Sequence, residues 1–191
     1  MSYDPLSISN TVLDLAEERA IPLRCHDLQR IVYFAHGINL TKTGLPLVSG
    51  CFEAWRNGPV HPVIYLSFCR AGEDVIDFRA SRQRTFSGLR SEVPPVTDRA
   101  AIDLLLRVVS PEIGGSPLHL SHLARAENAP WHHVVSRARE TKSVSFRITN
   151  SCIIERFAFH KANAAEDGDD ALVIDAPFSF QDFAGEIGVP A

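Results

Sequence analysis

The stretch from residue 53 to residue 65 constrains the fold more than any other part of the chain. It reads Glu-Ala-Trp-Arg-Asn-Gly-Pro-Val-His-Pro-Val-Ile-Tyr. The aromatic and small residues over 51–55 favour a strand. Gly58 tolerates a positive φ and Pro59 lacks an N–H, so the strand should end there. Because prolines are tolerated in the first turn of a helix, the prolines at 59 and 62 predict a helix over 60–70. The block therefore predicts a rigid strand–turn–helix corner, which on its own can be purely structural.

Apolar residues at helical spacing predict the other main elements. The segment 26–42 is apolar around much of its circumference, which is typical of a central buried helix that ends near Gly44. Val75, Ile76 and Phe78 indicate short strands within 74–90. Further helices are predicted over 8–20, 98–113, 131–140 and 150–163, with one more starting at Ser116-Pro117. The fold class that follows is α+β and mainly α-helical, a compact bundle of about six helices with a small antiparallel sheet.

Charge divides the chain into a domain over 1–165 and an acidic tail over 166–191. The tail holds seven acidic residues and no Lys or Arg, which leaves 16 acidic and 19 basic residues in the domain. Phe178, Phe180 and Phe183 lie in this tail, and such side chains are costly to leave in water. We expect the tail to dock on its own domain or on a dimer mate, or else to bind another protein.

The composition is that of a soluble globular protein, with 45% hydrophobic and 22% charged residues. No run approaches the roughly 18 apolar residues of a membrane span, and the N-terminus lacks the features of a secretion signal. The four cysteines are scattered, with no Cys-x-x-Cys pair. We therefore expect a cytoplasmic protein with reduced thiols and no membrane partner.

The chain shows no Gly-rich phosphate loop, nucleophile elbow or nucleotide fingerprint, and we expect no cofactor and no metal. One alternative is a small metal-dependent hydrolase that uses His61, His122 and His132, although their spacing is not that of a zinc motif. A second alternative is a nucleic-acid-binding module. It would use the loop from Arg79 to Arg90, which contains the arginines Arg79, Arg82, Arg84 and Arg90. The pI near 6.0 does not favour nucleic acid, and this loop can equally face the acidic tail or an acidic partner.

Three motifs follow one another along the chain. They are Leu28-Gln29-Arg30-Ile31-Val32-Tyr33-Phe34-Ala35-His36, then Glu53-Ala54-Trp55-Arg56-Asn57-Gly58-Pro59-Val60 with Pro62 and Tyr65, then Leu120-Ser121-His122-Leu123 through Glu127 to Pro130-Trp131. In order and spacing, over about residues 8–160, the chain resembles the Panacea-domain family, also described as SocA-like or GepA-like phage-associated proteins. Arg30 stands where lysine is commoner in the family, which keeps the charge but changes the hydrogen-bond geometry.

The resemblance implies a mainly helical domain with a small sheet and an antitoxin without catalytic activity. Such an antitoxin, of a type II-like pair, is encoded beside its toxin and neutralises it by direct binding. The resemblance also implies, for some relatives, an adaptor role that presents the toxin to a Clp-type protease. The tail after residue 165 lies outside the shared motifs, and a homodimer is also compatible with the sequence.

Within these motifs we expect the binding surface or its buried support. The residues are Gln29, Arg30, Tyr33, Trp55, Arg56, Gly58, Pro59, His61, Tyr65, His122, Glu127 and Trp131, with Phe178, Phe180 and Phe183 as tail contacts. Tryptophan, tyrosine and arginine dominate binding hot spots. The same aromatic side chains can instead be core residues, and the sequence leaves both readings open.

Overall fold

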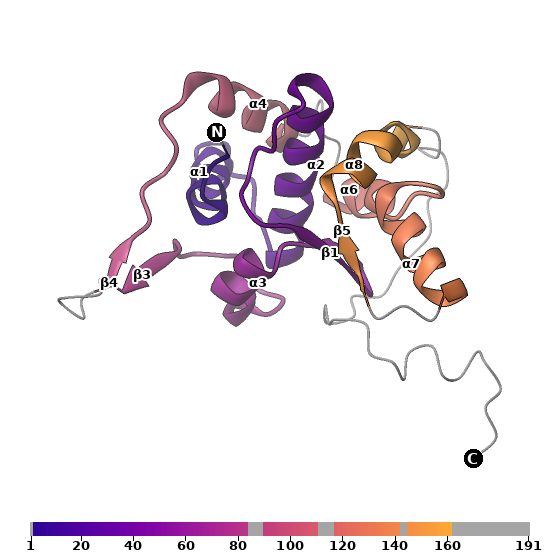
Figure 1. The fold of residues 1–191 in the computed structure, drawn as a ribbon. Helices are drawn as coiled ribbons and strands as arrows, with labels where there is room; N and C mark the ends of the chain where they lie inside the picture. The colour runs from indigo at the N-terminus through magenta and orange to yellow at the C-terminus, as the bar shows by residue number, and fades with distance from the viewer. Residues whose placement is uncertain (1, 84–89, 111–116, 142–144, 162–191) are drawn as a thin grey trace, which may run out of the picture.

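The computed structural model describes residues 2–83, 90–110, 117–141 and 145–161 (Figure 1). Within them lie seven α-helices and five short strands. The helices are α1 (Pro5–Glu17), α2 (Cys25–Thr43), α3 (Pro62–Phe68), α4 (Arg99–Val109), α6 (Pro117–Ala124), α7 (Pro130–Thr141) and α8 (Asn150–Arg156), and the 3₁₀ turns are η1 (Cys69–Ala71) and η2 (Phe157–Lys161). The strands are β1 (Phe52–Trp55), β2 (Gly58–Val60), β3 (Ser81–Gln83), β4 (Arg90–Glu92) and β5 (Arg147–Ile148). The predicted fold class, α+β and mainly helical, is confirmed.

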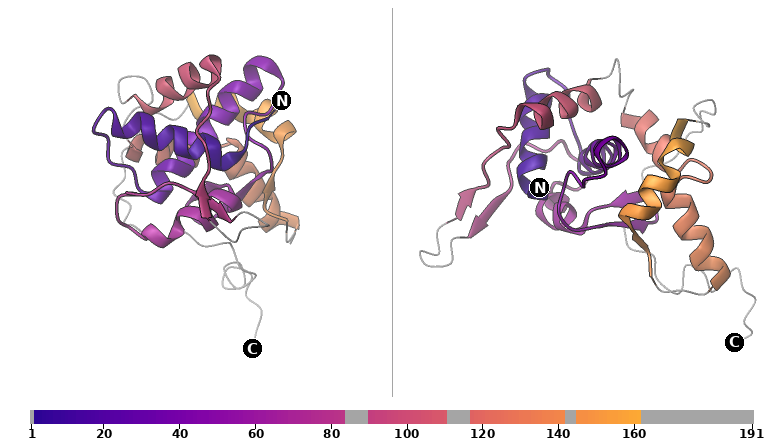
Figure 2. Two further views of the ribbon diagram at one scale, coloured as in Figure 1. Left: turned by 90° about the vertical axis from the view of Figure 1, so that its left-hand side faces the viewer. Right: turned by 45° about the horizontal axis from the view of Figure 1, so that its top comes forward.

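Helix α2 is the centre of the molecule. It contacts α1 and α4 on one side and α6 and α8 on the other, as the nearly end-on view of α2 in Figure 2 (right) shows. Its Leu28, Val32 and Tyr33 are completely buried. The ring of Phe157 in η2 lies against Gly37, where a β-carbon would collide with it. Glycine at this position therefore lets the C-terminal helices approach α2 closely. The predicted stop at Gly44 is confirmed by its left-handed φ of 71°.

The residues after β1 differ from the prediction. Residues 58–60 form a second strand, β2, which pairs antiparallel with β1 so that Ala54 faces Pro59 and Trp55 faces Gly58. The corner is therefore a β-hairpin followed by a helix, and only Pro62 stands in the first turn of α3. The strand β5 pairs with the other edge of β1, which gives the order β2-β1-β5.

Short strands were predicted within 74–90, and β3 lies there, but Val75, Ile76 and Phe78, the residues that suggested them, are not in a strand. Ile76 is buried and its N–H donates to Leu23 O, while Phe78 stacks on Phe68 at 5.7 Å between ring centroids. These side chains pack into the core from an irregular backbone, so their apolar character indicated burial and not pairing. The strands come later, as β3 and β4, which form a separate antiparallel ribbon at the opposite end of the molecule from α7 (Figure 1).

Several helix boundaries also differ from the prediction. Helix α1 begins at Pro5, because the Asp4 side chain accepts a hydrogen bond from Leu6 N (2.9 Å) as N-cap. Thr149 caps α8 in the same way by accepting from Cys152 N. Helix α4 ends at Val109, and residues 111–113 of the helix predicted over 98–113 lie outside the described residues.

Candidate functional site

Two adjacent side chains of α2 bind the backbone along the outer edge of β2. Gln29 Oε1 accepts from His61 N (2.8 Å), and Gln29 Nε2 donates to His61 O (3.4 Å). Arg30 Nη1 donates to Pro59 O (2.6 Å), and Arg30 Nη2 donates to Asn57 O. Residues 57, 59 and 61 alternate along the chain, so their carbonyls point to the same side, away from β1. Gln29 and Arg30 therefore make the hydrogen bonds that a neighbouring strand would otherwise make to this edge.

We call these hydrogen bonds from Gln29 and Arg30 to the backbone of residues 57–61 the clamp. The clamp explains why glycine and proline occupy positions 58 and 59. Pro59 faces the outer edge, where its missing N–H leaves no donor unpaired. Gly58 has a φ of 127°, and a β-carbon there would lie 2.8 Å from the Arg30 guanidinium. Arg30 is 1% exposed, and a charge so deeply buried is tolerated only when its hydrogen bonds are made. The first two sequence motifs are therefore two halves of one packing unit.

Two further predicted site residues, His61 and Tyr33, form hydrogen bonds in the core next to this packing unit. His61 Nε2–H donates to Ser49 O (2.9 Å), and burial lowers the pKa of His61, so the imidazole is neutral. The Tyr33 hydroxyl donates to His160 Nε2 (3.2 Å), and His160 Nδ1–H donates to Leu123 O (2.6 Å). This chain of bonds joins α2, η2 and α6. Sequence reasoning missed His160, because a lone histidine near the end of a predicted helix carries no signal.

The other predicted residues lie around the hairpin and the start of α7, where Trp55 is buried and its neighbours reach the surface. The Trp55 ring packs edge-on against Tyr65 of α3 at 4.7 Å between ring centroids. Trp131 Nε1–H donates to Trp55 O (2.7 Å), which fixes α7 to the hairpin. Arg56 and Glu127 are exposed, while Tyr65 and Trp131 are partly exposed. The second and third motifs therefore meet at one place.

Comparison with known proteins gives a consistent assignment. The family model "Antitoxin SocA-like, Panacea domain" matches residues 28–93, which contain the whole clamp and hairpin. Antitoxin SocA of Caulobacter vibrioides (strain NA1000 / CB15N) is 35% identical over 164 residues, which cover 86% of this chain and 87% of that protein. The chain belongs to the SocA-like Panacea-domain family. No solved structure matches it.

In this Panacea-domain protein the three histidines of the hydrolase hypothesis do not form a metal site. Within the described ranges, no group of three or more His, Cys, Asp or Glu side chains could hold a metal ion. His61 is in the core, and His132 Nδ1 accepts from Asn128 N (3.2 Å). His122 is partly buried on α6, and its Nε2 has no hydrogen-bond partner among the residues that the structure describes.

Two of the four arginines of the nucleic-acid hypothesis, Arg79 and Arg82, form ion pairs with carboxylates of α1 or of its N-cap. Arg79 Nε donates to Asp14 (2.7 Å), its Nη2 contacts Glu17, and Arg82 pairs with Asp4. Arg90 is exposed on β4, whereas Arg84 lies outside the described residues. The paired arginines hold the β3–β4 ribbon to the body of the protein. The tail residues Phe178, Phe180 and Phe183 also lie outside the described residues.

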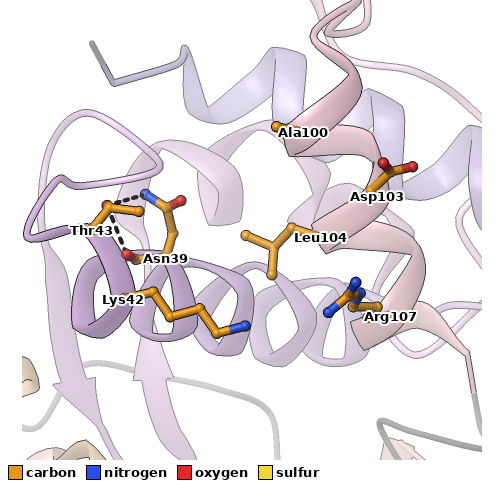
Figure 3. A pocket seen from close by; sticks show the side chains of 7 residues that line it. All are labelled: Asn39, Lys42, Thr43, Ala100, Asp103, Leu104 and Arg107. Atoms are coloured by element: carbon orange, nitrogen blue, oxygen red, sulfur yellow. Dashed lines mark hydrogen bonds between the residues drawn. The ribbon is translucent and has the colours of Figure 1, made fainter.

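A pocket of about 200 Å³ lies elsewhere, between the C-terminal end of α2 and α4 (Figure 3). Its lining consists of Asn39, Lys42, Thr43, Ala100, Asp103, Leu104 and Arg107. Lys42 is twelve residues beyond Arg30, about 18 Å along α2. The pocket therefore contains none of the predicted site residues. Among the described helices, none is long and apolar enough to cross a membrane.

Proposed function

We propose that this protein is a cytoplasmic antitoxin that neutralises a cognate toxin by direct protein–protein binding, with no catalytic step. The observation that carries the proposal is the 35% identity to antitoxin SocA over nearly the full length of both chains. An antitoxin of this kind needs a rigid scaffold and a surface with anchoring side chains. The clamp supplies the first, and the hairpin with the start of α7 supplies the second.

The proposed toxin-binding surface consists of Arg56, Glu127 and the accessible parts of Tyr65 and Trp131, with the buried Trp55 as their support. Tryptophan, tyrosine and arginine are the residue types that contribute most to interfaces. The Trp131–Trp55 hydrogen bond and the Trp55–Tyr65 ring contact hold them in place before binding. A prearranged surface loses less conformational entropy on association. Gln29, Arg30, Tyr33, Gly58, Pro59 and His61 act as buried support of this surface, with His122 on the neighbouring α6.

Co-expression with the product of the adjacent gene tests the proposal. The wild-type chain should relieve growth arrest and co-purify with that product. The double variant Arg56→Glu/Tyr65→Ala should lose both effects while keeping its circular dichroism spectrum. Arg99→Glu, at a 93% exposed side chain of α4, is the matched control and should behave as wild type. Growth arrest that the wild-type chain does not relieve would contradict the antitoxin function itself.

The adaptor form of this function adds proteolysis of the bound toxin by a Clp-type protease. It predicts that the toxin half-life shortens only when antitoxin and protease are both present. Rescue of growth with an unchanged toxin half-life would instead show neutralisation by binding alone. Both results preserve the antitoxin function and separate its two mechanisms.

A further inference from the structure

Helix α3 carries a stripe of side chains that no element of the described chain covers. In Figures 1 and 2 (left) the helix lies along the lower edge of the described part of the molecule. Ile64 and Phe68 are completely buried and fix its inner face. Val63, Leu66 and Arg70 stand at positions i, i+3 and i+7 on its outer face, where Val63 is 41% and Leu66 76% exposed. The outer face of a surface helix is ordinarily polar, so this apolar stripe needs an explanation.

The stripe ends in a positive charge that is held in place. The Arg70 guanidinium lies over the Phe78 ring, 3.7 Å from its centroid. It forms no ion pair with a carboxylate of the described residues, and this includes Glu73 and Asp74, which follow closely in the sequence. A guanidinium already fixed on an aromatic ring loses less side-chain entropy when it binds a carboxylate of a partner.

The stripe adjoins the aromatic side chains of the proposed toxin-binding surface. Tyr65 lies beside it on α3, and the Tyr65 ring packs against Trp55, next to the exposed Arg56 of the hairpin turn. From Arg56 to Arg70 the chain has no acidic residue. The carboxylate of Glu53, the one acidic residue of β1 and β2, accepts from Trp55 Nε1 (2.9 Å). This surface is therefore apolar and positively charged, which makes it complementary to an apolar surface bordered by carboxylates.

We propose that α3 places Val63 and Leu66 in an apolar cleft of the toxin and that carboxylates at the rim of this cleft pair with Arg70. The inference rests on the proposed antitoxin function and adds the chemistry of the partner surface. Amphipathic helices bind apolar grooves through anchors at this spacing. Because α3 is folded and packed before binding, the association does not include the cost of ordering it.

A second copy of this chain fits the stripe less well than a different protein. A homodimer contact about a two-fold axis brings the same surface of both copies together. Two α3 helices crossing antiparallel at Leu66 would place Arg70 of one copy opposite Pro62 and Val63 of the other, where there is no carboxylate. The charge of Arg70 therefore favours an acidic partner over a copy of the same stripe.

Titration of the purified protein with the purified product of the adjacent gene tests this surface. Leu66→Asp should raise Kd by about thirtyfold or more, the effect of losing a hot-spot side chain. Leu66→Ser, which adds no charge, should raise it about tenfold. Leu45→Asp, at a 55% exposed side chain beyond the end of α2, is the matched control and should leave Kd within about twofold of wild type. Because these side chains are exposed, all variants should keep the circular dichroism spectrum and urea midpoint of wild type.

The charged end of the stripe is tested separately. Arg70→Gln should weaken binding several-fold and make Kd less dependent on salt concentration, because one charge pair across the interface is lost. Arg90→Gln, at an exposed arginine of β4, should change neither quantity.

Three results would overturn the inference. If the wild-type chain binds the product and Leu66→Asp binds it equally well, the antitoxin function stands and α3 is not in the interface. If the wild-type chain sediments as a dimer and Leu66→Asp as a monomer, the stripe belongs to a second copy. If the wild-type chain neither binds the product nor relieves growth arrest, the proposed function fails and this inference fails with it.

Discussion

At the residue scale, Arg30 has the most demanding environment of the described chain. Its guanidinium reaches two carbonyl oxygens two residues apart along β2, and the planar fork of arginine suits this geometry better than the single ammonium of lysine. The resemblance to the family implied that Arg30 stands where lysine is commoner. It could not show that the side chain is buried, because a charged residue in a helix is ordinarily a surface residue.

Arg30→Lys should therefore lower the free energy of unfolding by about 1.5–3 kcal/mol, the range for a lost hydrogen bond to a charged group. Arg30→Met should cost more, because both carbonyls lose their donor. Urea unfolding followed by circular dichroism measures the difference. Arg99→Lys, at an exposed position, serves as the control. Equal stability of Arg30→Met and wild type would show that the clamp contributes nothing.

Gly58→Ala tests the same contact from the hairpin. The φ of 127° and the 2.8 Å approach to Arg30 both oppose a side chain, so a loss of about 1–3 kcal/mol is expected. Gly44→Ala is the matched control, since Gly44 is in the left-handed region, with φ 71°, but has open space around it. Its cost should be about 1 kcal/mol. If the two variants lost the same amount, the contact with Arg30 would not be the cause.

At the scale of the elements, helices were predictable and the hairpin was not. The pattern over 26–42 identified α2 within a residue at each end, because apolar periodicity is a local property. The strand β2 was missed, because Gly58 and Pro59 signal an interruption when only the local chain is considered. They fit a strand here because α2 satisfies its outer edge, and that contact joins residues about 30 positions apart.

The junction between the hairpin and α7 gives a prediction at this scale. Trp131→Phe keeps an aromatic ring but removes the N–H that donates to Trp55 O. We expect a loss of about 1 kcal/mol in unfolding free energy. Amide hydrogen exchange should become faster at the start of α7 and in β1, with no change in α1. Uniform acceleration over the whole chain would instead indicate a general loss of stability.

At the scale of the whole molecule, buried neutral histidines link stability to pH. His36 and His160 are 1% and 3% exposed, and burial lowers the pKa of each to about 4. Because the pKa is near 6.5 in the unfolded chain, that chain binds more protons between pH 6.5 and pH 4. Stability is therefore full above pH 6.5 and falls as the pH decreases toward 4.

Between pH 7 and pH 5, each of these two histidines should account for a loss of up to about 2 kcal/mol. Urea unfolding at several pH values measures this slope, and His160→Gln should make it shallower. A wild-type stability that is constant from pH 7 to pH 5 would contradict the assignment of both histidines as neutral.

The Trp131–Trp55 hydrogen bond has a practical consequence as well. The chain contains two tryptophans, and this bond places both at the junction of the hairpin with α7. Intrinsic fluorescence of the protein is therefore emitted from one location, next to the exposed Arg56. Without any label, the emission of this chain reports on events at that junction and not at the distant β3–β4 ribbon.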